Sequence, residues 1–105
     1  MRIVEVVNLI MYRNTDFVNI FDFQTLNIST YTFYSKIRNK DGTLIETFTI
    51  SKPTNYQLQL LLSKAETQEL ELETYYYDII QSVSSVEEVI IKGTITVENT
   101  ITNLE

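Results

Sequence analysis

The chain has 105 residues, 44% of them hydrophobic, and a formal net charge of −6. This length suits one domain, residues 1–105, and is too short for two. Histidine and cysteine are absent, which excludes disulfides, thiol and imidazole catalysis, and nearly all zinc or iron sites, so no cofactor is expected. The acidic balance argues against nucleic acid and anionic membranes as partners, and no window approaches the ~20 apolar residues of a membrane span.

Ile, Val, Phe and Tyr dominate the apolar residues, and there is one Ala, so β structure is favoured over helix. Residues 2–12 (RIVEVVNLIMY) are apolar apart from a few interruptions such as Glu5 and Asn8, which predicts a strand. Apolar side chains occupy both of its faces, which exceeds what an edge strand buries in its own domain. We therefore expect a neighbouring subunit to cover the surplus face. The alternative is a central strand buried wholly within its own domain.

Residues 17–23 (FVNIFDF) predict a second strand, again with apolar groups on both faces. Sheets rarely expose a row such as Val18 and Ile20 to water without reason. This strand is therefore either central in the core or covered on its second face by another chain. In the connection that follows, we expect Leu26 and Ile28 to point inward.

The best local evidence for a hairpin lies in the next segment. Residues 30–38 (TYTFYSKIR) alternate well, with the odd-numbered members from Tyr31 to Ile37 on one side and the even-numbered members from Thr32 to Arg38 on the other. The Asn-Lys-Asp-Gly turn at residues 39–42 supplies the glycine that a hairpin needs, and residues 43–50 return as the partner strand.

Residues 56–62 (YQLQLLL) resume the alternation, with Tyr56 and every second leucine facing inward. Ser63 followed by Glu66 fits a capping box, which predicts one or two helical turns across one end of the fold. Leu70 is expected to be their buried anchor. The order of strand, short helix and inward tyrosine resembles the corner by which immunoglobulin-like domains pass between their sheets.

Residues 70–102 organise the chain, because they contain two long alternating segments joined by a short polar turn. These segments centre on residues 75–80 (YYYDII) and 89–97 (VIIKGTITV). Strand side chains alternate between faces. One face is therefore expected to hold Tyr75, Tyr77 and Ile79, and the other Tyr76, Asp78 and Ile80. The first is predicted to be core, and the second to be solvated or docked.

Roughly seven strands at intervals of about ten residues, with no sustained helix, predict an all-β fold. The expected architecture is a small antiparallel immunoglobulin-like β-sandwich of about seven strands with one short helical turn. A partly open barrel is the alternative, since it also buries one alternating face per strand.

The succession KIRNKDGTLIETFTI, LQLLLSKAETQEL, YYYDI and IIKGTITVENTIT resembles small immunoglobulin-like structural proteins of tailed bacteriophages. The resemblance covers nearly the whole chain and implies a virion component without catalytic residues. In those proteins a glycine often precedes the tyrosine strand, where this chain has Glu73 and Thr74. The matching positions are Arg38, Leu62, Ser63, Thr67, Leu70, Tyr75, Tyr77, Asp78, Ile79, Gly93, Val97 and Thr102.

Two groups of residues are candidates for a protein interface. One is the apolar N-terminal segment. The other places three cations along one strand and its turn, which fits an acidic partner surface and equally fits charged protection of an exposed sheet edge. The candidate interface residues are Ile3, Val4, Val6, Lys36, Arg38 and Lys40.

Other clusters favour plain structural roles. The glutamates between residues 66 and 73 could ligate calcium, but calcium loops concentrate Asp, Asn and Gly, so a solvated acidic edge is the preferred interpretation. The tyrosines could stack on sugars, although core and interface positions suit them better. Carboxylate pairs such as Asp78 with Glu88, or Glu46 with Asp41, lack the cleft that catalysis needs. No catalytic, cofactor or metal site is predicted.

The sequence leaves three functions in contention. The first is a non-enzymatic structural protein of a phage virion, an auxiliary or decoration protein of the capsid that is present in many copies and adds stabilising interface to the shell. The second is a tail, baseplate or head-fibre adaptor. The third is a carbohydrate-binding or receptor-binding module. No receptor-binding stalk or repeat is visible in the sequence, which favours the first.

Overall fold

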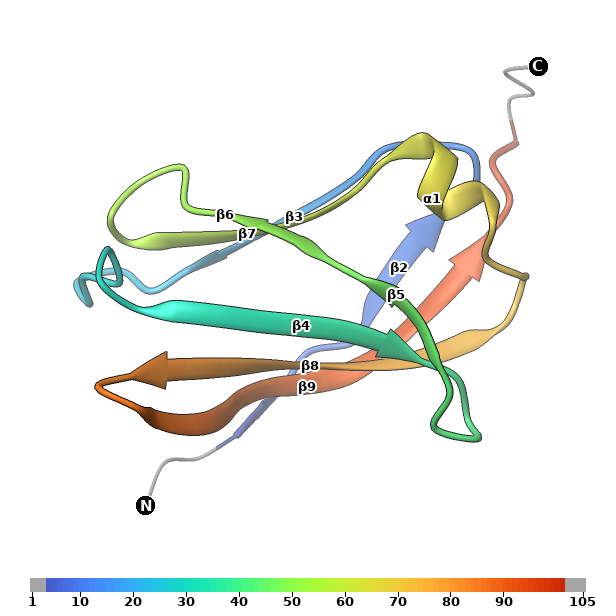
Figure 1. The fold of residues 1–105 in the computed structure, drawn as a ribbon. Helices are drawn as coiled ribbons and strands as arrows, with labels where there is room; N and C mark the ends of the chain where they lie inside the picture. The colour runs from blue at the N-terminus through green and yellow to red at the C-terminus, as the bar shows by residue number, and fades with distance from the viewer. Residues whose placement is uncertain (1–3, 102–105) are drawn as a thin grey trace.

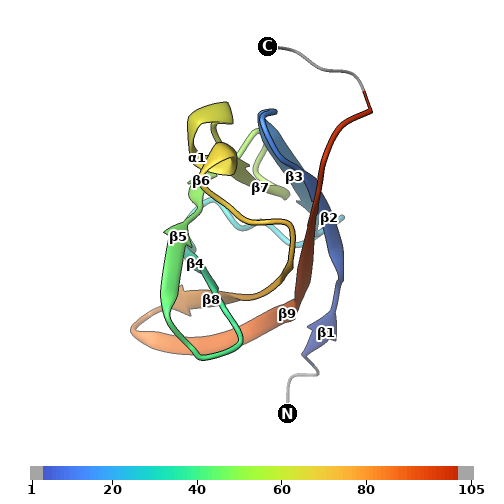
Figure 2. The ribbon, with the colours of Figure 1, turned by 90° about the vertical axis from the view of Figure 1, so that its right-hand side faces the viewer.

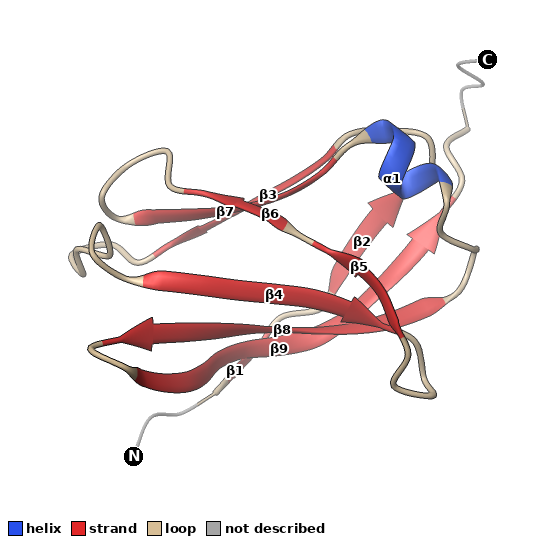
Figure 3. Ribbon diagram, in the orientation of Figure 1, coloured by secondary structure: helices blue, strands red, loops and turns tan. Residues whose placement is uncertain are grey.

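The computed structural model describes residues 4–101 and shows two β-sheets packed face to face (Figure 1; Figure 3). The larger sheet has the order β1-β9-β8-β4-β5, with β2 also paired to β9, and the smaller sheet has the order β3-β7-β6. The elements are β1 (Glu5–Val6), β2 (Leu9–Tyr12), β3 (Phe17–Asp22), β4 (Thr32–Arg38), β5 (Leu44–Thr47), β6 (Thr49–Ser51), β7 (Gln57–Leu62), α1 (Lys64–Gln68), β8 (Thr74–Val83) and β9 (Val86–Glu98).

The strand order is that of an immunoglobulin-like sandwich. In that fold strands B, E and D are neighbours in one sheet, and C, F and G are neighbours in the other. Here β3-β7-β6 take the first order and β4-β8-β9 the second. The predicted small immunoglobulin-like β-sandwich with one short helix is therefore confirmed. One departure is that β1 and β2 pair with β9 in parallel, along one edge of the larger sheet (Figure 2).

The prediction of one continuous strand over residues 2–12 is wrong, because Val7 and Asn8 interrupt it and divide it into β1 and β2. The backbone of Val7 lies so close to Gly93 that a Cβ on that glycine would collide with the Val7 carbonyl oxygen. One residue later, the carboxamide oxygen of Asn8 accepts hydrogen bonds from the amide and hydroxyl of Thr94, at 3.1 and 3.2 Å. A side chain thus bridges the break in the backbone ladder.

The strand predicted over residues 43–50 is also two strands, because the chain changes sheet between β5 and β6. Phe48 lies at the crossover with its side chain buried. Its ring centroid is 5.9 Å from that of Phe17 and 6.4 Å from that of Tyr77. Burial of this ring accounts for a change of sheet without glycine or proline, and the two divided strands raise the strand number above the seven expected.

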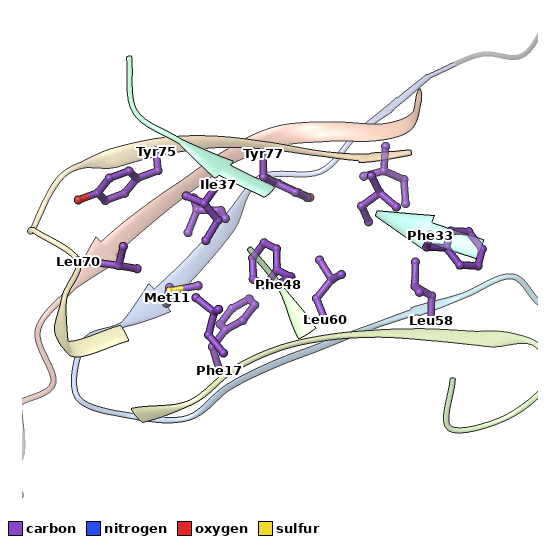
Figure 4. Close-up of a cluster of buried hydrophobic side chains, with 14 of the residues drawn as sticks. Met11, Phe17, Phe33, Ile37, Phe48, Leu58, Leu60, Leu70, Tyr75 and Tyr77 are labelled. Atoms are coloured by element: carbon purple, nitrogen blue, oxygen red, sulfur yellow. The ribbon is translucent and has the colours of Figure 1, made fainter. Parts of the chain in front are cut away.

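The core lies between the sheets and follows the predicted alternation (Figure 4). Two expectations fail, because Leu26 and Tyr56 are exposed by 38% and 42%. Both occupy connections outside the strands, where the sandwich no longer covers their side chains. Phe33, Ser35 and Ile37, which were predicted to share one side of their strand, are all buried. The residues predicted inward and found buried are Ile28, Leu58, Leu60, Leu62, Leu70, Tyr75, Tyr77 and Ile79.

Helix α1 begins where the capping box predicted it. The hydroxyl of Ser63 accepts from the amide of Glu66 at 3.2 Å, and the Glu66 carboxylate accepts from the Ser63 amide at 2.8 Å. Leu70 is fully buried behind the helix. The hydroxyl of Tyr75 accepts a hydrogen bond from the amide of Glu71 at 2.9 Å. Such a bond back to the upstream backbone is the tyrosine corner of immunoglobulin-like sandwiches.

Two serines, Ser84 and Ser85, form the turn of the β8–β9 hairpin. Ser84 and Ser85 have φ angles of 51° and 66°, and positive values at both central residues define a type I′ turn, whose twist matches that of the flanking strands. Further along, a register shift leaves Ile90 as an extra residue in β9. Because of this bulge, Ile90 and its neighbour Ile91 are both buried.

Candidate protein-interaction face

The outward side chains of β1, β4, β8 and β9 form one continuous surface on the larger sheet, here called the outer face. It results from the period of two, since every second residue of β4 and of most of β8 is buried and the residues between them point away from the core. The outer face comprises Val6, Tyr34, Lys36, Arg38, Tyr76, Asp78, Ile80, Glu87, Lys92 and Thr94.

One row of the outer face alternates in charge. Lys36 pairs with Asp78 across β4 and β8, and Asp78 pairs with Lys92 across β8 and β9. Val6 continues the row on β1, opposite Lys92. Asp78 therefore lies between two lysines in the ladder, and the row ends in an apolar residue.

The next row joins a cation to an aromatic ring. Arg38 pairs with Tyr76, and Tyr76 pairs with Thr94. The Nη1 group of Arg38 donates a hydrogen bond to the carbonyl oxygen of Gly42, at 3.0 Å. This bond ties the guanidinium to the β4–β5 turn, next to the ladder position of Tyr76.

A depression of about 410 Å³ covers both rows, and a second hollow of about 350 Å³ adjoins it over β4 and β8. Lys36, Arg38 and Asp78 line both hollows. Val6 and Tyr76 line the first and expose 60% and 47% of their surface. Tyrosine and arginine around an apolar centre are the composition that protein interfaces favour.

The outer face includes three of the predicted interface residues, which are Val6, Lys36 and Arg38. Lys40 is exposed in the turn between β4 and β5 and does not line either hollow. Val4 is half-buried just before β1. Ile3 lies outside the described residues, as does Thr102 of the sequence resemblance.

Sequence reasoning missed several members of this face, notably Tyr76, Asp78 and Lys92 as neighbours of Lys36 and Arg38. The period of two had placed Tyr76 and Asp78 on the wet or docked side of their strand. The missing information was that β8 lies between β4 and β9. A search for alternating segments that could pair with residues 32–38 would have found this set.

The smaller sheet also exposes an apolar pair. Val18 and Ile20 on β3 are exposed by 52% and 48%, and Leu61 of β7 lies opposite Val18. Because β3 is an edge strand, its interpretation as a central strand is wrong. The other interpretation, that a second chain covers this pair, stays a prediction.

Ionisation is perturbed away from the outer face. Burial raises the pKa of Glu46 in β5, and the carboxylates of Glu66 and Glu69 raise it further. Burial also raises the pKa of Tyr75, and it raises the pKa of Tyr77 to about 12. These groups belong to an acidic corner near α1 and to the core, so the shifts have structural causes.

One of the carboxylate pairs considered from the sequence, Asp78 with Glu88, is divided between the two faces of the larger sheet. Asp78 belongs to the outer face, whereas Glu88 lies opposite the buried Gln81, so their side chains project to different faces of the sheet. Among residues 4–101 no group of three or more acidic side chains is placed to hold a metal ion. The described part of the chain also contains no helix long and apolar enough to cross a membrane.

The sequence matches no model of a known protein family, and a search of curated proteins likewise finds no match.

Proposed function

We propose that this protein is a non-enzymatic structural protein of a bacteriophage particle, an auxiliary or decoration protein of the capsid. It docks onto other virion proteins through the outer face and adds stabilising interface to the shell. In this role it is present in many copies and is located in the virion. A tail, baseplate or head-fibre adaptor would use the same docking surface in another part of the particle.

The observation that carries the docking role is the depression over Val6, Arg38 and Tyr76. Contiguous apolar side chains that remain half exposed on the surface mark interaction sites. Here Tyr76 and Val6 line the same depression as the charged side chains of Lys36, Arg38 and Lys92. Aromatic and arginine side chains together are enriched in protein interfaces.

Two further observations support the virion assignment. The sequence resembles small immunoglobulin-like structural proteins of tailed phages over nearly its whole length, and the strand order is that of an immunoglobulin-like sandwich. The chain also lacks histidine and cysteine, the residues that most often act as activated bases and nucleophiles. A scaffold with a docking surface fits both facts.

The test is incorporation into particles. Tyr76→Asp and Val6→Asp each place a carboxylate in the proposed contact, where burial without a partner is costly. Both proteins should fold, since these side chains point away from the core, and both should be absent from purified particles. Leu72→Asp is the control, because Leu72 is 52% exposed in the loop before β8 and outside the outer face.

Normal incorporation of both outer-face variants would defeat the docking surface. Immunogold labelling of particles that carry the wild-type protein separates the positions. Gold label on the shell would support the capsid role. Gold label on the tail or fibres would support the adaptor role instead.

Carbohydrate binding is a second candidate, favoured by the exposed ring of Tyr76 in a depression that also presents Asn8, Asp78 and Thr94. Aromatic rings stack on sugars, and the polar groups could accept or donate hydrogen bonds to hydroxyl groups. A glycan array distinguishes it. Saturable binding of one glycan class that Tyr76→Ala abolishes would establish this function instead.

A further inference from the structure

The depression of about 410 Å³ on the outer face differs in charge from the rest of the molecule. The whole chain carries a formal net charge of −6, yet the depression is lined by the cations Lys36, Arg38 and Lys92 against the single carboxylate of Asp78. Asp78 stands between the two lysines. The depression is therefore a local positive region on an acidic protein, and its excess charge centres on Arg38.

These cations have little to neutralise them within the chain. Arg38 makes one hydrogen bond among the described residues, through Nη1 to the carbonyl of Gly42, which leaves most of its five N–H donors for a ligand. Within residues 4–101, neither Lys36 nor Lys92 has a carboxylate oxygen within 4 Å of its ammonium nitrogen. Most of these donors therefore have no partner among the described residues.

Apolar surface adjoins the positive charge. Tyr76 lies opposite Arg38 in the β4–β8 ladder, and Val6 borders the same depression from β1. A ligand that reaches Arg38 must therefore also cover an aromatic ring and a valine. Inorganic anions cannot do this, whereas a peptide with a carboxylate next to an apolar side chain can.

We propose that the depression binds an acidic segment of a partner protein, in which a Glu or Asp precedes or follows a large apolar residue. The carboxylate takes the free edge of the Arg38 guanidinium, the geometry that favours bidentate pairing. The apolar side chain packs between Tyr76 and Val6. This inference rests on the proposed docking function and adds the chemistry of the partner.

Charge favours a short segment over other occupants. Nucleic acid presents a dense row of phosphates to the whole protein, and the net charge of −6 repels it. A second copy of this chain carries the same net charge, so two copies repel each other as well. A short acidic segment brings only a few charges, all of which face the positive region.

Fluorescence polarisation with two labelled peptides tests the proposal. The first is a short peptide that alternates Glu and Leu, and the second has Gln in place of every Glu. The acidic peptide should bind saturably, and the Gln peptide should bind far more weakly. Arg38→Gln should weaken binding on the order of tenfold, as expected for loss of a charged hydrogen-bonding group, and Lys92→Gln should weaken it less. Lys64→Gln, which removes the same charge from α1, should change it by less than about twofold.

Three outcomes would overturn the proposal. Equal binding of the two peptides would show that only the apolar surface matters. Equal losses of peptide affinity in Arg38→Gln and Lys64→Gln would show nonspecific electrostatic attraction. Analytical ultracentrifugation could also show a concentration-dependent dimer that Arg38→Gln dissociates, which would identify a second copy of the chain as the occupant. If the acidic peptide fails while Tyr76→Asp still excludes the protein from particles, the docking function stands and the acidic partner does not.

Discussion

The hydroxyl of Tyr77 donates a hydrogen bond to the carbonyl oxygen of Val7, at 2.7 Å. Tyr77 is a core residue of β8, and Val7 lies at the break between β1 and β2. Gly93 lies between them on β9 as the ladder partner of Tyr77, and its missing side chain makes room for the contact. A core tyrosine thus fastens the N-terminal segment to the sandwich.

Removing this hydroxyl should loosen the N-terminal segment. Tyr77→Phe keeps the ring but leaves the Val7 carbonyl without its donor, so we expect a loss of about 1 to 2 kcal/mol in the free energy of unfolding. Urea unfolding measures the loss, and hydrogen exchange of the β2 amides should become faster. Tyr76→Phe is the control, since the Tyr76 ring is on the outer face. Equal losses in the two variants would contradict the role of the Tyr77 bond.

Gly93→Ala should detach the same segment by a different route. The added Cβ would collide with the Val7 carbonyl oxygen, and overpacking of this kind costs about 1 to 3 kcal/mol. Limited proteolysis should then cut within residues 5–12 while the remaining sandwich stays intact. Gly42→Ala is the matched control, because nothing lies within 4 Å of its Cβ position. Its positive φ makes that substitution costly by about 1 to 2 kcal/mol, but the N-terminal segment should stay protected.

Stability should fall at alkaline pH because of Tyr77. Burial raises the pKa of its hydroxyl to about 12, from 10.0. The folded state favours the neutral hydroxyl, so this contribution is fully present below pH 10 and is lost as the pH rises through 12. Tyr77→Phe cannot ionise, so its unfolding free energy should fall less steeply over that range. Parallel curves for the two proteins would disprove the assignment.

The phase of β8 can be tested with neighbouring residues. Ile79 is fully buried and its truncation to Ala should cost about 2 to 5 kcal/mol, because it removes core volume. Tyr77→Ala should fall in the same range. Asp78→Ala should cost much less, since Asp78 belongs to the outer face. If urea melts showed Asp78→Ala to be the most damaging of the three, the strand would have the opposite phase.

Short-range patterns predicted the parts of the fold that depend on neighbours in sequence. The alternation through Tyr75, Tyr77 and Ile79 gave the buried face of β8, and the capping box of Ser63 and Glu66 gave the start of α1. Each signal lies within one element. The same is true of the turn at residues 39–42, where Gly42 has a φ of +83°.

Features that depend on distant contacts could not be predicted. The break at Val7 depends on the lack of a side chain at Gly93, and the change of sheet depends on the pocket that receives Phe48. The turn at Ser84 and Ser85 lacks the Asn-Gly signal that normally marks a type I′ turn. In each case the deciding partner is remote in the sequence, or the residue type is one that turns seldom use.

The candidate site shows the same division. Alternation placed Lys36 and Arg38 on one side of their strand and Tyr76 on the solvated or docked side of its own, and the cations near residue 38 suggested an acidic partner surface. The pairing of β4 with β8 and of β8 with β9 then determines which outward residues become neighbours. Sequence reasoning could therefore propose single members of the face but not the depression that they form.

The attachment of β1 and β2 to β9 joins segments that are made at different times during synthesis. Asn8 bonds to Thr94, 86 positions away, so β1 and β2 are made well before the strand they pair with. Contacts of such high separation form late and slowly. Until β9 has been made, the apolar segment that ends near Met11 has no strand to pair with. A chain that stops short of β9 would leave the apolar side chains of this segment exposed to solvent. Truncations before residue 89 should accordingly accumulate as aggregates.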